Sequence, residues 1–333
     1  MIINIDSLIG KISATVASHK LEEGVYTRWL WQNETGTRRL GINEYGCADA
    51  ANILYTIGEF PGESASREAW VRTLQSLQDP ETGLFVEETH HFIHTTAHCT
   101  AALELFDAKP KYPMTALAEY ATPEGVVGLL ESLDWLSEPW DMSHRGAGIY
   151  AALKLSDSVD DAWCDVYFDW LWENADPETG FWSKGAVTAG VKPKGHHLAG
   201  TFHYLFNHEY ARRPLRYPER VIDTCVQMFD DKNVLETFAR NVGFMEVDWV
   251  YTLSRACRQS GYRHEDYVRV LSAFAEDYIG FLESLDEKTH DGLNDLHALF
   301  GAVCCLAELQ QALPGMIRSS KPLKLVLDRR PFI

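Results

Sequence analysis

The chain has 333 residues, of which 46% are hydrophobic, and a formal net charge of −18 at pH 7. Nucleic acids and anionic membrane surfaces bind basic surfaces, so this charge argues against both as partners. No stretch has the roughly 18 uncharged apolar residues that a membrane-spanning helix requires. We therefore expect a small-molecule or oligosaccharide partner.

The first 20 residues lack the basic start and the continuous apolar block of a secretory signal. We expect an amphipathic N-terminal helix there. The seven cysteines form no CxxC pair, and several occupy small-residue positions in apolar segments. This pattern is typical of reduced, buried thiols and predicts a cytoplasmic protein.

A segment rich in small residues recurs along the chain and ends in leucine each time. The final leucines are Leu54, Leu103, Leu153, Leu205, Leu253 and Leu306, so successive copies lie 48 to 53 residues apart. Each period has room for two helices of about 11–18 residues and two connections. The sequence therefore predicts six helical hairpins. Small residues on most faces favour inner positions for the recurring segments, and the partner segments, with their large aromatic and charged residues, are expected outside.

Turns are expected before several of these inner helices. The sequence Asp-Pro-Glu-Thr-Gly occurs at 79–83 and again at 176–180, and residues 286–292 are a looser copy. Proline and glycine end helices, which predicts a turn at each place. Because no linker interrupts the repeat, we expect a single domain over 1–333, with a tail at 311–333. The tail ends in the apolar residues Pro331, Phe332 and Ile333 and is expected to pack back on the domain.

The segment from Gln78 to Phe106, QDPETGLFVEETHHFIHTTAHCTAALELF, resembles the repeat of terpenoid cyclases and protein prenyltransferase β-subunits. In that superfamily a turn precedes a small-residue inner helix. The resemblance implies an all-α (α/α)6 toroid with its active site at the mouth of a central cavity. Many glycoside hydrolases, polysaccharide lyases and sugar epimerases share this architecture, so the fold does not choose a reaction.

The sequence departs from the chemical motifs of the terpenoid families. It has no DxDD acid, and Asp230-Asp231-Lys232-Asn233-Val234 lacks the last carboxylate of DDxxD. Asp295-Leu296-His297 with Cys304-Cys305 matches only the last part of the prenyltransferase zinc site. A terpenoid cyclase or prenyltransferase therefore stands as an alternative, and so does a non-catalytic toroid that serves as a binding scaffold.

Two layers of side chains are expected around the cavity, because residues i and i+4 share a helix face. The residues nine before each leucine form the first layer, and those four later form the second. The first layer is Tyr45, His94, His144, His196, Phe244 and His297, and the second is Asp49, His98, Gly148, Gly200, Asp248 and Gly301. We expect the three glycines to leave space for a ligand.

This composition predicts a carbohydrate-active enzyme that uses acid/base catalysis. Asp49 and Asp248 could act as paired carboxylates in glycoside hydrolysis. In a lyase or epimerase, a uronate carboxylate could be neutralised by residues at two neighbouring helix starts, namely His144, Arg145, Lys194, His196 and His197. A histidine, with His144 and His196 as the catalytic candidates, or Tyr45 would then take the proton. The further residues expected to bind substrate are Tyr45, His94, His98, Trp249, His297 and Glu44. No metal or cofactor is assigned, although His94 and His98, spaced i, i+4, could hold a divalent ion with Asp49 or Asp248.

Overall fold

The computed structural model describes residues 2–234 and 237–333, and most of them are helical. The expected all-α class is confirmed. The strands are short: β1 (Ile3–Asn4) pairs in parallel with β4 (Ile317–Arg318), and β2 (Lys20–Glu22) pairs antiparallel with β3 (Val25–Tyr26). Within the described ranges, no helix combines the length and the apolar character needed to cross a membrane.

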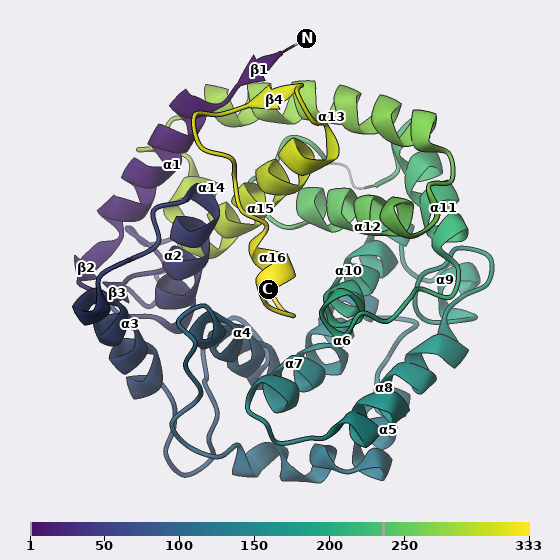
Figure 1. Cartoon of the computed structure of the whole chain (residues 1–333), viewed down its shortest axis with the longest axis horizontal. Helices are drawn as coiled ribbons and strands as arrows, with labels where there is room; N and C mark the ends of the chain where they lie inside the picture. Colours follow the sequence, from purple (N-terminus) through teal and green to yellow (C-terminus); the bar gives the residue numbers. More distant parts are fainter. Residues whose placement is uncertain (1, 235–236) are drawn as a thin grey trace.

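A closed ring of helices surrounds the centre of the molecule (Figure 1), and its members contact one another in cyclic order. In chain order these inner helices are α2 (Glu44–Ile57), α4 (Phe92–Glu104), α6 (Pro139–Gly146), α7 (Gly148–Leu155), α10 (Lys194–Ala211), α12 (Met245–Ser260) and α15 (Leu296–Ala312). Contacts between α15 and α2 close the ring. The first and last inner helices therefore lie side by side.

A second set of helices lies outside this ring (Figure 1). These outer helices are α1 (Asp6–Ser18), α3 (Ser64–Ser76), α5 (Pro123–Ser132), α8 (Asp161–Asn174), α11 (Pro218–Asp230) and α13 (His264–Ser284). Short helices complete the described chain: the 3₁₀ helix η1 (Thr115–Ala121), α9 (Ala186–Ala189), α14 (Asp291–Asn294) and α16 (Val326–Arg329). The expected N-terminal helix is confirmed as α1.

Helix α2 shows how local sequence sets the position of a central helix. The Asn43 side chain accepts hydrogen bonds from the backbone N–H groups of Tyr45 and Gly46 and so caps the start of the helix. Gly58, at φ 79°, ends it in the left-handed conformation that favours glycine. A Cβ on Gly46 would lie 2.6 Å from the backbone nitrogen of Arg28, so only glycine permits this approach. These features fix the level at which α2 presents its side chains.

The recurring segments lie in the inner helices, as predicted, but the third one is divided. Helix α6 ends at Gly146, and α7 begins at Gly148. A Cβ on Gly146 would lie 2.3 Å from the Tyr204 hydroxyl, and one on Gly148 would lie 3.1 Å from the Ile93 side chain. Both glycines are therefore sites of close approach between inner helices at the break.

The two Asp-Pro-Glu-Thr-Gly turns are confirmed, and they have the same geometry. Asp79 Oδ1 accepts the backbone N–H groups of Glu81 (2.9 Å) and Thr82 (2.8 Å), and Gly83 adopts φ 74°. In the second copy, Asp176 Oδ1 accepts from residues 178 and 179, and the glycine has φ 76°. The aspartate and the left-handed glycine thus reverse the chain before an inner segment.

The C-terminal tail enters the ring. Helix α16 and the residues after it lie at the centre of the ring in Figure 1. Arg330, Phe332 and Ile333 are buried, which confirms that the tail packs back on the rest of the protein. All seven cysteines are buried and free of disulfides, as expected from their spacing.

Candidate functional site

A cavity of about 600 Å³ opens near the N-terminal ends of the inner helices. Imidazole is the most frequent side chain in its wall. The wall consists of Thr89, His90, His91, His94, Trp140, Asp141, Met142, His144, Arg145, His203, Phe244, His297 and Ile333. Helices α4, α6, α10 and α15 each contribute a histidine. Such a convergence of polar groups in one concave site is typical of a ligand-binding or catalytic site.

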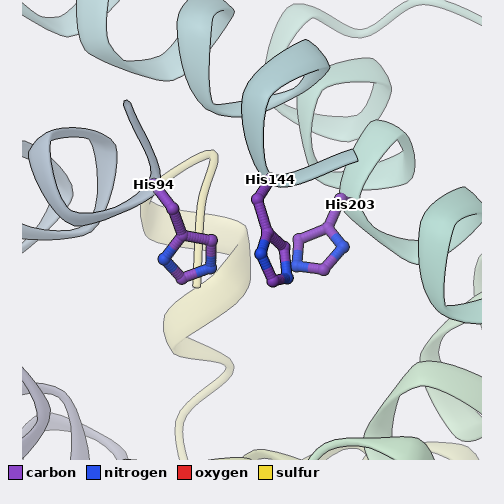
Figure 2. A group of neighbouring side chains, drawn as sticks. All are labelled: His94, His144 and His203. Atoms are coloured by element: carbon purple, nitrogen blue, oxygen red, sulfur yellow. The ribbon is translucent and has the colours of Figure 1, made fainter. Parts of the chain in front are cut away.

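Three of these histidines point toward one another (Figure 2). We call His94, His144 and His203 the three-histidine cluster. One side-chain nitrogen from each lies within 4.8 Å of the other two. The ring centroids of His94 and His144 are 4.4 Å apart, and those of His144 and His203 are 5.1 Å apart. The cluster joins α4, α6 and α10 at the cavity wall.

Hydrogen bonds on the far side of two imidazoles orient them. His94 Nδ1 lies 2.7 Å from the Tyr45 hydroxyl, which also lies 3.2 Å from Thr95 Oγ1. His203 Nδ1 lies 3.0 Å from the carbonyl oxygen of Ala199. A carbonyl only accepts, so His203 Nδ1 carries the hydrogen and donates it, and Nε2 keeps its lone pair.

Burial keeps the cluster uncharged at neutral pH. Removal from water lowers the pKa of His94 and of His144 well below 6.5, and neighbouring imidazoles lower both further. Burial also lowers the pKa of His203 to about 3. A neutral imidazole offers a lone pair to a proton or to a metal ion.

A second buried group lies beside the cluster and is built on Asp49. His98 Nε2 is 2.7 Å from Asp49 Oδ1, and His297 Nδ1 is 3.0 Å from Asp49 Oδ2. The Tyr45 ring stacks on His98 and meets His297 edge-on. Of these residues only His297 reaches the cavity wall. The Asp49–His297 pair therefore connects a buried carboxyl group to the cavity.

The positive charges of Arg28 and Arg330 affect the pKa values of Asp49 and His297. Burial raises the pKa of Asp49, and the guanidinium groups of Arg28 and Arg330 oppose that rise. Burial lowers the pKa of His297 well below 6.5, and the positive charge of Arg28 adds to the effect. Arg330 is fully buried, and although burial lowers its pKa to about 10, it remains a cation at neutral pH. The positive charge of Arg330 therefore opposes burial, which still holds the pKa of Asp49 well above its usual range.

The tail forms part of the cavity floor. The Phe332 ring lies 4.9 Å from the His94 ring and 5.9 Å from the His203 ring, and Ile333 lines the cavity. Arg330 lies over the Phe300 ring at 5.4 Å. The chain after α16 thus fills the centre of the ring below the histidines.

The structure brings together most of the residues that the sequence nominated. Tyr45, Asp49, His94, His98, His144 and His297 lie in one connected group, and Arg145 lines the same cavity. Arg145 Nε is buried without a hydrogen-bond partner, and its NH1 lies 3.8 Å from Met142 Sδ. Among the described residues, Arg145 forms no ion pair.

Other nominated residues lie outside the cavity wall. Asp248 is buried with both carboxylate oxygens unpartnered, while Trp249 packs between Phe229 and Phe274 and donates its Nε1 hydrogen to Cys225 O. His196 lies beside Trp140, 5.9 Å between ring centroids. His197 is buried, with neither ring nitrogen hydrogen-bonded, and Glu44 pairs with Arg39.

The expectation that three glycines leave space for a ligand is wrong. A Cβ on Gly200 would lie 2.8 Å from the carbonyl oxygen of Pro139, and one on Gly301 would lie 2.4 Å from that of Gly243. Gly148 faces Ile93 and Phe332. Because these glycines have no side chain, neighbouring segments pack closely against them. The cavity therefore does not arise from the space beside these glycines.

His203 and His90 belong to the site, and the repeat alignment did not nominate them. His203 lies seven residues after His196, two turns along the same face of α10. Helix α6 packs against the first half of α10, where Gly200 meets Pro139, and the cavity is reached only further along. The i, i+7 spacing of His196 and His203 was the one feature of the sequence that could have indicated His203 as a site residue.

No protein-family model, no curated protein and no solved structure matches this chain. The fold and the site define a mostly helical protein with a ring of inner helices and a histidine-lined cavity.

Proposed function

We propose that this chain is an (α/α)6 toroid enzyme that removes a proton from a small uronate or uronate-containing oligosaccharide, as a lyase or epimerase does. The observation that carries the proposal is the hydrogen bond between His297 and Asp49, because His297 also lines the cavity. A carboxylate that accepts from Nδ1–H leaves Nε2 as the basic nitrogen, and a neutral imidazole is an effective general base near neutral pH.

Arg145 supports a carboxylate-bearing substrate. Arg145 lines the cavity and forms no ion pair with a carboxylate among the described residues, in a chain whose net charge is −18. Arginine binds carboxylates through paired hydrogen bonds. Arg145 would neutralise the charge of a carboxylate bound there and so lower the pKa of the hydrogen on the adjacent carbon. That hydrogen is the proton that a uronate lyase or epimerase must remove.

The reaction follows from these two groups. His297 Nε2 takes the proton from the carbon next to the carboxylate, and the electron pair forms a carbon–carbon double bond as the neighbouring C–O bond breaks. The imidazolium then returns the proton to the departing oxygen. An epimerase would instead need a second acid, on the opposite side of the sugar ring, to deliver a proton to the other face of that carbon.

The geometry gives less support to hydrolysis by paired carboxylates. Asp49 is buried and bonded to two imidazoles, and Asp248 does not line the cavity. Among the described residues, Asp141 has the one carboxylate side chain in the wall. Hydrolysis needs an acid and a base on either side of the scissile bond.

A screen of uronate-containing oligosaccharides tests the proposal. The ultraviolet absorbance of an unsaturated product reports elimination, and proton exchange with deuterated water, followed by NMR, reports epimerisation. We expect one of the two signals with at least one substrate. If neither appears with any uronate, the proposed reaction is wrong, and new reducing ends without unsaturation would indicate a hydrolase.

A further inference from the structure

We infer that the three-histidine cluster binds one divalent transition-metal ion, with zinc as the first candidate, through His94, His144 and His203. This inference stands on the geometry of the cluster and does not depend on the proposed reaction.

The positions of the three imidazoles favour a single ion. One nitrogen from each lies within 4.8 Å of the others (Figure 2). Tetrahedral zinc holds nitrogens at about 2.1 Å, so that two of them are roughly 3.4 Å apart. Small rotations of the side chains close the remaining separation. The ligands come from three packed helices, α4, α6 and α10, which hold them in place without a ligand.

The surroundings of the cluster orient the nitrogens as metal ligands. His203 donates Nδ1–H to the Ala199 carbonyl, which directs Nε2 into the cluster. His94 Nδ1 faces the Tyr45 hydroxyl, which can donate its own hydrogen to Thr95 and accept from His94. Metal-binding histidines commonly donate their second ring N–H to such a partner.

The cluster also leaves a coordination position open. All three histidines line the cavity, so a fourth ligand can reach the ion from that side. Three protein ligands with one open position are typical of catalytic zinc, whereas structural zinc has four protein ligands. Water or an oxygen atom of a substrate would complete the site.

The neighbouring Asp49 group is a poorer candidate. Its carboxylate oxygens already accept from His98 and His297, at 2.7 and 3.0 Å, and all three residues are buried. An ion there would have to replace both hydrogen bonds. The Asp49 group therefore serves as the alternative metal site that the experiment compares with the three-histidine cluster.

Zinc titration of the full, untagged chain, freed of metal with a chelator, tests the inference by calorimetry. Cobalt gives a second readout through the visible absorption of a tetrahedral Co²⁺ site. We expect one equivalent to bind and the affinity to fall at least about 100-fold in both His94→Gln and His144→Gln. Tyr45→Phe should weaken binding about 10- to 100-fold through the lost hydrogen bond. The exposed His264→Gln, on α13, is the matched control, and circular dichroism checks that each variant folds.

The alternatives are decided by the same titration. The inference is overturned if the chain binds no stoichiometric ion, or if binding persists in both cluster variants. It is also overturned if His98→Gln abolishes binding while His144→Gln does not, because the ion would then lie at Asp49. Turnover of uronates plays no part in this readout, so the proposed function can fail while the metal site stands.

Discussion

His297 Nδ1 lies 3.0 Å from Asp49 Oδ2, although 248 residues separate the two along the chain. The pair joins the first inner helix, α2, to the last, α15, where the ring closes. The hydrogen bond between Asp49 and His297 can form only when α2 and α15 lie side by side, so the site depends on the closure of the ring.

Asp49→Asn should lower kcat on a uronate about 100- to 10,000-fold, the usual contribution of general acid/base catalysis. The asparagine can donate an N–H to His297 Nδ1, which favours the tautomer that carries its hydrogen on Nε2. Nε2 is the nitrogen that must act as the base, so this tautomer is inactive. Steady-state kinetics measure the loss. Unchanged kcat in a folded variant would show that Asp49 does not position a base.

Arg145→Gln should raise KM for a uronate about 10- to 100-fold, because a charge-assisted pair to the substrate carboxylate is lost. Arg145→Lys keeps the charge without the planar fork and should lose less. Affinity for the corresponding neutral sugar, measured by calorimetry, should not change. Equal losses for the acid and the neutral sugar would contradict an anion-binding role.

The acidic limb of kcat/KM should lie below pH 6.5. A general base must be uncharged, and burial, with help from Arg28, lowers the pKa of His297 well below that value. The imidazole therefore stays neutral, and active, as the pH falls through 6.5, and activity is lost only when it is protonated at lower pH. An acidic limb above pH 6.5 would rule out His297 as that base.

Gly200→Ala should destabilise the protein by about 1–3 kcal/mol, since its Cβ would lie 2.8 Å from the backbone oxygen of Pro139 and force α6 away from α10. Gly280→Ala is the matched control. It lies in α13 with nothing within 4 Å of the added Cβ and should gain about 0.5–1 kcal/mol. Urea denaturation measures both, and equal effects would contradict the close approach.

Asp248→Asn should become more stable relative to the parent as the pH rises. Burial and the nearby Glu246 raise the pKa of Asp248, whose oxygens have no partner. The folded parent therefore holds a proton that the unfolded chain releases above about pH 4, which costs up to about 1.4 kcal/mol per pH unit until the folded group ionises. Denaturation curves from about pH 5 to pH 8 measure the difference. A difference that does not change with pH would mean that Asp248 is ionised in the folded state.

The sequence predicted the inner helices and the turns well because their signals are local. The Asp79 and Asp176 turns, for example, need only their own side chains and a following glycine. It could not predict which histidine of α10 reaches the cavity, since that depends on how far α6 packs along α10. For the same reason, the sequence wrongly predicted that Gly200 and Gly301 leave room for a ligand. In the structure, backbone atoms of neighbouring segments occupy that space. The tail was expected to pack back, but its position under His94 depends on the closed ring.

The rate of His297→Gln on a uronate that the parent chain converts is the most direct test of the proposed chemistry. The variant should be folded, should keep the zinc affinity of the parent chain, and should lose at least about 100-fold in kcat, while His264→Gln should match the parent. A folded His297→Gln that turns over the same substrate at the parent rate would contradict the claim that the Asp49–His297 pair supplies the base.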